Sequence, residues 1–109
     1  MKGIVFLLLI ALFAPTLSLH AADAKANWDA NCVPCHGKEG KADTVMGKAL
    51  KAKDLTDPKA QAEFSDSKAA DSIRTGVKEN GRVTMTAFGD KLSEDEIKAL
   101  VAYIRTLKR

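Results

Sequence analysis

The sequence predicts an all-α fold for a single small domain that covers residues 23–109. After residue 22 no convincing alternation of apolar and polar residues is found, so no β-strand is expected. Apolar residues recur instead at helical spacing. The clearest helix lies near the C-terminus, where Ser93 and Glu96 form a capping box. An apolar stripe follows it, made of Ile97, Leu100, Val101, Ile104 and Leu107.

The first 22 residues are typical of a cleaved secretory signal peptide. Lys2 is followed by an apolar run from Ile4 to Ala14, and Pro15 ends that run. An uncleaved membrane anchor is the alternative, but this segment is shorter than the ~20 apolar residues that span a bilayer. Cleavage is expected within about two residues of Ala22, so the mature chain begins near residue 23.

A first helix is expected from about Ala24. It places Trp28 and Cys32 on one face, because residues four apart lie one above the other on a helix. Residues 38–57 are rich in lysine, glycine and aspartate, which predicts an irregular segment with one short turn at Met46–Leu50.

Asp57 and Pro58 predict the start of a short helix, with Asp57 as N-cap and proline at the first helical position. A further helix is expected to start at Ser65 or Asp66 and to end in the glycine-containing region 76–81. A loop holding Met85 then leads to the last helix. The apolar stripe of the middle helix consists of Ala69, Ala70, Ile73 and Val77.

Composition limits the function and the size of the core. Lysine and arginine total 17 against 14 acidic residues, and removal of Lys2 leaves a mature charge of 16 − 14 = +2. No clustered basic face is found, so a nucleic-acid partner is not expected. Three lysines at 48, 51 and 53 form either a small docking patch or an ordinary solvated face. Only four aromatic residues follow the leader, so a large apolar cofactor is expected to complete the core.

The most informative motif is a pair of cysteines followed by histidine, Cys32-Val33-Pro34-Cys35-His36, which is the attachment pattern of c-type haem. Cysteines three residues apart on one helical turn face the same way, so each thiol can add across a haem vinyl group to form a thioether. Neutral imidazole is a suitable axial ligand for haem iron. The motif predicts one covalently bound haem on Cys32 and Cys35, with His36 as the proximal iron ligand.

Two other sites use a CxxC pair. A structural zinc site needs four ligands, but the chain has no further cysteine, and its other histidine, His20, lies in the leader. A thioredoxin-like dithiol needs a βαβ context, which this sequence lacks. Haem attachment therefore remains the best interpretation.

The second axial position of the iron decides between an electron carrier and a haem that binds small molecules. After the leader, the available side chains are Met85, Met46, Tyr103 and several lysines. Met85 is favoured, because it lies far from the motif in sequence and can return to the opposite face of the haem. Met85 as core filling, and Met46 as a rival ligand, remain open alternatives.

From Cys32 through Arg105 the chain resembles the small class I c-type cytochromes. The resemblance implies a small cytochrome c fold, with three to five helices wrapped around one covalently bound haem. It implies that Met85 is the distal axial iron ligand and that Trp28 and Tyr103 lie where the first and last helices cross. The segments that carry it are Cys32–Gly37, Trp28, Met85-Thr86-Ala87-Phe88, Leu92–Ile97 and Leu100–Ile104.

Three positions depart from the family pattern. Thr86 replaces the proline that often follows the ligand methionine, and Ala24 stands where a glycine often eases the helix crossing. In family members a proline carbonyl often accepts a hydrogen bond from the ligand histidine. Val45 or a neighbour takes that place here, which leaves the hydrogen-bond partner of His36 open.

These features predict a soluble one-electron carrier whose haem c cycles between Fe(III) and Fe(II). It is expected to be a monomeric periplasmic protein, with no membrane span in the mature form, that meets redox proteins transiently. The alternative is a haem-based binder or sensor of CO, NO or O₂ in which Met85 is displaced. An enzyme is not expected, because no second catalytic cluster of the kind a peroxidase needs is visible.

Overall fold

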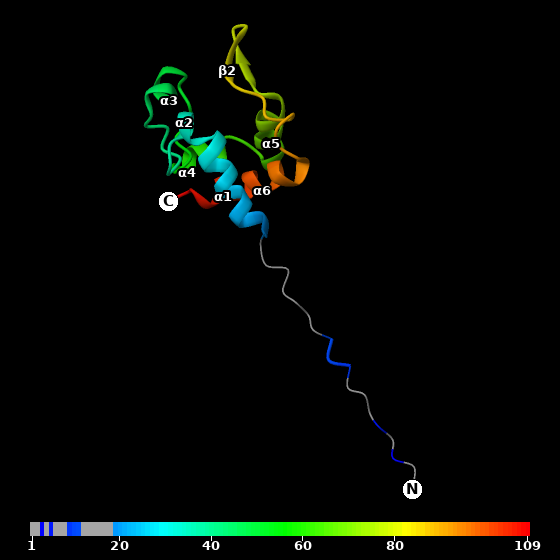
Figure 1. Ribbon diagram of the computed structural model, residues 1–109. Helices are drawn as coiled ribbons and strands as arrows, with labels where there is room; N and C mark the ends of the chain where they lie inside the picture. The colour runs from blue at the N-terminus through cyan, green and yellow to red at the C-terminus, as the bar shows by residue number, and fades with distance from the viewer. Residues whose placement is uncertain (1–2, 4, 6–8, 12–18) are drawn as a thin grey trace.

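The computed structural model describes residues 3, 5, 9–11 and 19–109, and the fold is mostly helical (Figure 1). Most of the predicted signal peptide, residues 1–2, 4, 6–8 and 12–18, lies outside the described residues. None of the described helices is long and apolar enough to cross a membrane. In chain order the elements are α1 (Leu19–Asn31), α2 (Val33–His36), α3 (Val45–Ala49), α4 (Pro58–Ala62), α5 (Asp66–Thr75), β1 (Val77–Glu79), β2 (Arg82–Met85) and α6 (Glu94–Thr106).

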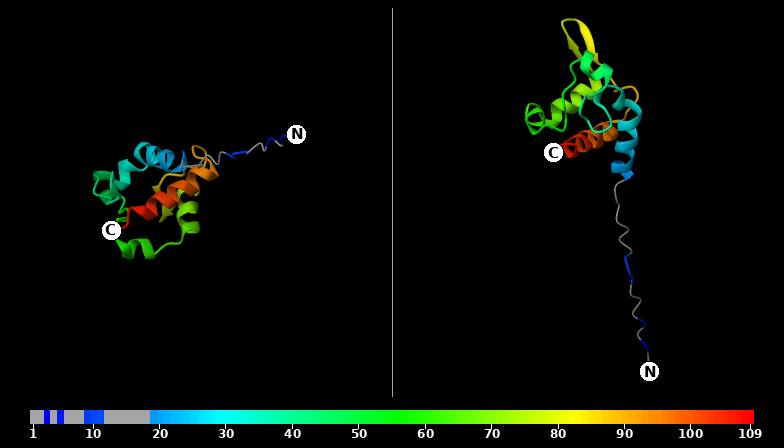
Figure 2. Two further views of the ribbon diagram at one scale, coloured as in Figure 1. Left: turned by 90° about the horizontal axis from the view of Figure 1, so that it is seen from below. Right: turned by 90° about the vertical axis from the view of Figure 1, so that its left-hand side faces the viewer.

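Helices α1 and α6 cross (Figure 2), and the core lies at this crossing. Trp28 of α1 is 1% exposed and Leu100 of α6 is 0% exposed. Tyr103 packs against Trp28, with ring centroids 5.6 Å apart, so the two residues that the family resemblance placed at the crossing meet there. Ala24 is also buried and has only a methyl side chain, which suits a close approach of the two helices.

Hydrogen-bonding side chains start the helices at the positions predicted from the sequence. Asp57 accepts a hydrogen bond from the amide of Lys59 at the start of α4, and Ser65 accepts one from the amide of Lys68 at the start of α5. Ser93 and Glu96 form the predicted capping box of α6. Each of these contacts satisfies an amide that has no partner within its own helix.

The prediction that no strand follows the leader was wrong, although the fold is still mainly helical. β1 and β2 form an antiparallel hairpin, and Met85 is the last residue of β2 and does not lie in a loop. Asn80 and Gly81 connect the strands with φ of 51° and 76°. Both values are positive, as in a type I′ turn, for which Asn-Gly is the preferred pair. The Asn-Gly pair is the local signal that identifies this hairpin.

The number of helices and the start of α1 also differ from the predictions. Six helical segments are present in the described part of the chain, one more than the expected maximum, because the motif begins the separate helix α2. Pro34 has no amide hydrogen, so the hydrogen-bond ladder of α1 cannot continue through it. The backbone of α1 begins at Leu19, before the expected start near Ala24 and before the expected cleavage site.

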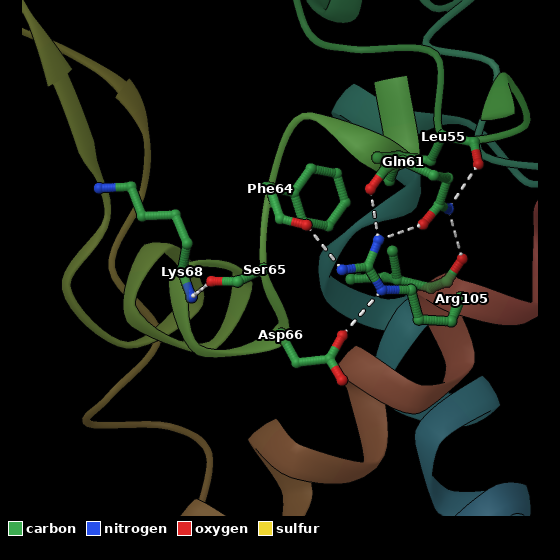
Figure 3. Close-up of polar contacts among 8 residues, drawn as sticks. Leu55, Gln61, Phe64, Ser65, Asp66, Lys68 and Arg105 are labelled. Carbon is green, nitrogen blue, oxygen red and sulfur yellow. Dashed lines mark hydrogen bonds and ion pairs between the residues drawn. The ribbon is translucent and has the colours of Figure 1, made fainter. Parts of the chain in front are cut away.

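A network around Arg105 ties the segment 55–66, which contains α4, to α6 (Figure 3). The guanidinium donates to the carbonyl oxygens of Gln61 at 2.6 Å and Phe64 at 2.7 Å, and to the carboxylate of Asp66 at 2.8 Å. It also lies 4.5 Å from the centroid of the Phe64 ring. The buried Gln61 amide nitrogen donates to the carbonyl oxygens of Leu55 and Ile104. The Arg105 side chain thus fixes the residues between the end of α4 and the start of α5.

We expect Arg105→Lys to destabilise the fold by about 1–3 kcal/mol, because an ammonium group cannot reach these separate acceptors and leaves backbone carbonyls without donors. Urea unfolding of the haem-loaded protein measures the change. Arg74→Lys is the matched control, since the Arg74 guanidinium bonds only to the exposed carboxylates of Asp71 and Glu94. An equal loss of stability in both variants would contradict the special role of Arg105.

Glu96 links the two crossing helices, and its charge predicts a pH dependence of stability. Its carboxylate accepts hydrogen bonds from the amide of Ser93 at 3.0 Å and from the side chain of Asn27 at 2.9 Å. These bonds hold the pKa of Glu96 below its ordinary value of 4.5. A lowered pKa in the folded state means that the stabilisation is complete above the unfolded pKa and is lost as the pH falls through the folded value.

We therefore expect Glu96→Gln to unfold with a weaker pH dependence than the parent protein below pH 4.5. Denaturant midpoints recorded at a series of acidic pH values measure this effect. If the two proteins lose stability in parallel over that range, Glu96 does not contribute to the acid sensitivity.

Candidate haem site

The three residues of the predicted attachment motif lie on consecutive turns at the junction of α1 and α2. The amide of His36 donates to the Cys32 carbonyl at 2.8 Å, so this segment is helical despite the break at Cys32. Cys32 is buried and Cys35 is half-buried, and neither is in a disulfide. Burial and the nearby Cys35 raise the pKa of the Cys32 thiol to about 11. Because the two cysteines are not joined to each other, both sulfurs can form thioethers.

His36 packs beside the aromatic core. Its ring centroid lies 5.7 Å from that of Trp28, whose indole N–H in turn donates to the Lys38 carbonyl at 3.3 Å. Burial lowers the pKa of His36 and so favours the neutral imidazole, the form that can bind a metal ion. The Nδ1 atom is buried and has no hydrogen-bond partner in the part of the chain that the structure describes.

The backbone after the motif is held by the segment that leads into α3. The amide of Ala42 donates to the His36 carbonyl at 2.8 Å, and the hydroxyl of Thr44 donates to the Cys35 carbonyl at 2.9 Å. The sequence did not point to Thr44 as a site residue, although a threonine before a short helix is a recognisable N-cap signal. Val45, expected at the place of the family's proline, is 89% exposed, and the described residues provide no acceptor for Nδ1.

Met85 is better placed than Met46 to take part in a buried site. Met85 is half-buried at the end of β2 and packs against the core cluster that includes Trp28 and Cys32. Met46, on α3, is 52% exposed. The chain just after Met85 is fixed to α5, because the amide of Phe88 donates to the Ile73 carbonyl at 2.8 Å.

The candidate residues come from two parts of the chain at one end of the molecule. Figure 1 shows α2 and α3 on one side of this end and the hairpin that carries Met85 on the other. Two hollows lie elsewhere: one of about 430 Å³ between α5 and α6, and one of about 280 Å³ beside Arg105. None of Cys32, Cys35, His36 and Met85 lines either hollow, so the hollows are separate from the candidate site.

The residues at this end of the molecule fit a covalently bound haem. Two free thiols three residues apart can form the thioethers, and a neutral imidazole follows directly. Two thiols and one neutral imidazole in this order form the donor set that a c-type haem requires. No group of three or more histidine, cysteine or acidic side chains in the described part of the chain could hold a bare metal ion.

A small helical domain with this motif defines a haem protein of the c type, and comparison with known proteins identifies the family. The model of the family described as "Cytochrome C oxidase, cbb3-type, subunit III" matches residues 20–104. The chain belongs to this family, within the class I c-type cytochromes. Its cofactor is one covalently bound c-type haem.

Curated relatives include two proteins named cytochrome c6. The one from a Synechococcus species is 35% identical over 93 residues, which cover 85% of this chain and 75% of the relative. The one from Rippkaea orientalis is 32% identical and covers 87% of this chain and 78% of the relative. The cbb3-type cytochrome c oxidase subunit FixP of Azorhizobium caulinodans is 38% identical over 72% of this chain, but the match spans only 24% of that longer protein.

Solved structures show the same fold. The KustC0563 c-type cytochrome superposes with a TM-score of 0.72 at 33% identity, and the match covers 80% of this chain and 99% of that one. A variant of the same protein superposes with a TM-score of 0.68 at 34% identity. The predicted cytochrome c fold, the family and the haem cofactor are therefore confirmed.

Proposed function

We propose that this protein carries single electrons between redox proteins, with its haem attached to Cys32 and Cys35. His36 and Met85 are the two axial iron ligands. The observation that carries the proposal is the combination of the helical attachment motif with a half-buried methionine that reaches the core from the separate hairpin. The exposed Met46 is the weaker candidate for the second ligand.

The haem supplies the chemistry, a reversible change between Fe(III) and Fe(II). The chain supplies a neutral imidazole, a thioether and an apolar surrounding that includes Trp28, and a methionine ligand with an apolar surrounding raises the reduction potential. Two strong protein ligands leave no iron position for a substrate. The protein is therefore a carrier and not an enzyme, in line with its cytochrome c6 relatives.

Residues 1–22 are proposed to act as a signal peptide, and residues 23–109 to form the mature domain. Haem attachment to c-type proteins outside the cytoplasm agrees with export to the periplasm, where two free thiols so close together would otherwise tend to form a disulfide. Redox partners then meet the mature protein, a monomer, through brief contacts suited to rapid turnover.

We expect Met85→Ala to keep the haem covalently attached but to open the sixth iron position. The ferric protein then loses the weak far-red band of methionine ligation, and the ferrous protein binds carbon monoxide. Absorption spectra with and without carbon monoxide measure both effects. Met46→Ala is the matched control and keeps the parent spectrum.

Two results would change this assignment. If Met46→Ala loses the far-red band and Met85→Ala keeps it, the ligand role moves to Met46. If the parent ferrous protein itself binds carbon monoxide with high affinity, gas binding replaces electron transfer as the proposed function.

The carrier function itself is tested by mixing the ferrous protein with an oxidised small copper or haem protein in a stopped-flow instrument. We expect rapid oxidation of the haem, because an electron can leave without any change in iron ligation. The rate is expected to change with salt concentration, since the exposed surface carries many charges. Failure to exchange electrons with every such partner tried would reject the proposal.

A further inference from the structure

We propose that Thr44 and Gly47 of the α3 segment are positioning residues for the haem ligand His36. They fix the peptide backbone at Cys35 and His36 and thereby set the direction of the imidazole. This inference rests on the proposed role of His36 as an iron ligand. It assigns a task to α3, a five-residue helix that contains none of the proposed ligands.

Thr44 joins α3 to the motif through a single hydroxyl. As the N-cap of α3, its oxygen accepts a hydrogen bond from the amide of Gly47 at 2.9 Å. The same hydroxyl donates to the carbonyl of Cys35 at 2.9 Å. A hydroxyl can do both, since it has one hydrogen and two acceptor lone pairs. The start of α3 and the end of the motif therefore share one half-buried atom.

Gly47 allows this close contact because it has no side chain. It is buried, and a Cβ atom added there would overlap the carbonyl oxygen of Cys35 and lie 2.9 Å from the Thr44 hydroxyl. Both neighbours are parts of the contact described above, so neither can move without breaking it. Any larger residue at position 47 would push α3 away from the motif.

Apart from the two haem thioethers, the backbone of the motif has few constraints of its own. Helix α2 is only four residues long, and its N-cap, Cys32, makes no side-chain hydrogen bond. Such short helices are not stable alone, because few hydrogen bonds offset the cost of starting a helix. The carbonyls of Cys35 and His36 are instead held from outside, by the Thr44 hydroxyl and the Ala42 amide.

No described residue forms a hydrogen bond with Nδ1 of His36, so none of them orients the imidazole in this way. In most metal sites a second-sphere acceptor at this atom fixes the ring. Here the ring direction is set by its own backbone and by the packing against Trp28. The contacts that the Thr44 hydroxyl and the Ala42 amide make with the Cys35 and His36 carbonyls therefore take the place of the usual hydrogen bond to the ligand.

The test compares Thr44→Val, Thr44→Ser and Gly47→Ala in the exported, haem-loaded protein. Valine has the shape of threonine without the hydroxyl, whereas serine keeps the hydroxyl. We expect Thr44→Val and Gly47→Ala to weaken the ferric far-red band, to shift the reduction potential and to lower the fraction of chains with covalent haem. Thr44→Ser should restore all three towards the parent values.

Ser65→Ala is the matched control, because it removes the N-cap of α5 far from the motif in sequence. It should lower the unfolding midpoint while leaving the band, the potential and the haem content unchanged. The inference is overturned if Thr44→Val and Gly47→Ala behave like Ser65→Ala. If the parent protein itself lacks histidine and methionine ligation, the proposed function is rejected. The spectrum of the parent protein alone gives this result, so it is distinguished from a failure of the inference about Thr44 and Gly47, which only the variants test.

Discussion

The packing of Trp28 is the contact on which most of this structure depends. Its indole ring lies between His36 and Tyr103, with centroid distances of 5.7 Å and 5.6 Å, and so touches both the motif and the last helix. The side chain is also among the three largest that are fully buried, together with Ile97 and Leu100 of α6. One aromatic residue thus joins the helix crossing to the proposed iron ligand. Its position four residues before Cys32 follows from helix periodicity.

The rest of the core is small, which explains why polar contacts hold so much of the chain. Among the described residues, the buried apolar set includes no phenylalanine, and four of its members are alanines, at positions 24, 42, 60 and 69. A domain of this size gains little from side-chain burial alone. A covalently bound haem adds a large apolar surface at one end of the molecule. Elsewhere, the side chains of Arg105 and Gln61 hold α4 and the residues after it against α6 by hydrogen bonds to backbone carbonyls.

The sequence was sufficient to predict the parts of the fold that are determined by local signals. The caps at Asp57 and Ser93, the helix start at Ser65 or Asp66 and the apolar stripe of α6 all depend on neighbouring residues, and the structure confirms them. The haem cofactor was also predictable, because the attachment chemistry requires a fixed spacing of two cysteines and a histidine. The hairpin was missed although its Asn-Gly turn is a local signal, since its two strands are only three and four residues long.

Contacts between distant segments could not be predicted in the same way. Nothing in the sequence around Thr44 shows that its hydroxyl meets the Cys35 carbonyl, because that contact depends on how α3 folds back over the motif. The buried Nδ1 of His36 is likewise visible only in three dimensions.

The Thr44–Cys35 contact and the unpartnered Nδ1 of His36 are related features. The proposed ligand His36 has no hydrogen-bond partner for Nδ1 among the described residues, whereas the backbone at Cys35 and His36 is anchored twice. The absence of a side chain at Gly47 is what permits the anchor between the Thr44 hydroxyl and the Cys35 carbonyl. A sequence that lacks the usual proline near this position can therefore still hold its histidine in one orientation, by fixing the main chain instead of the ring.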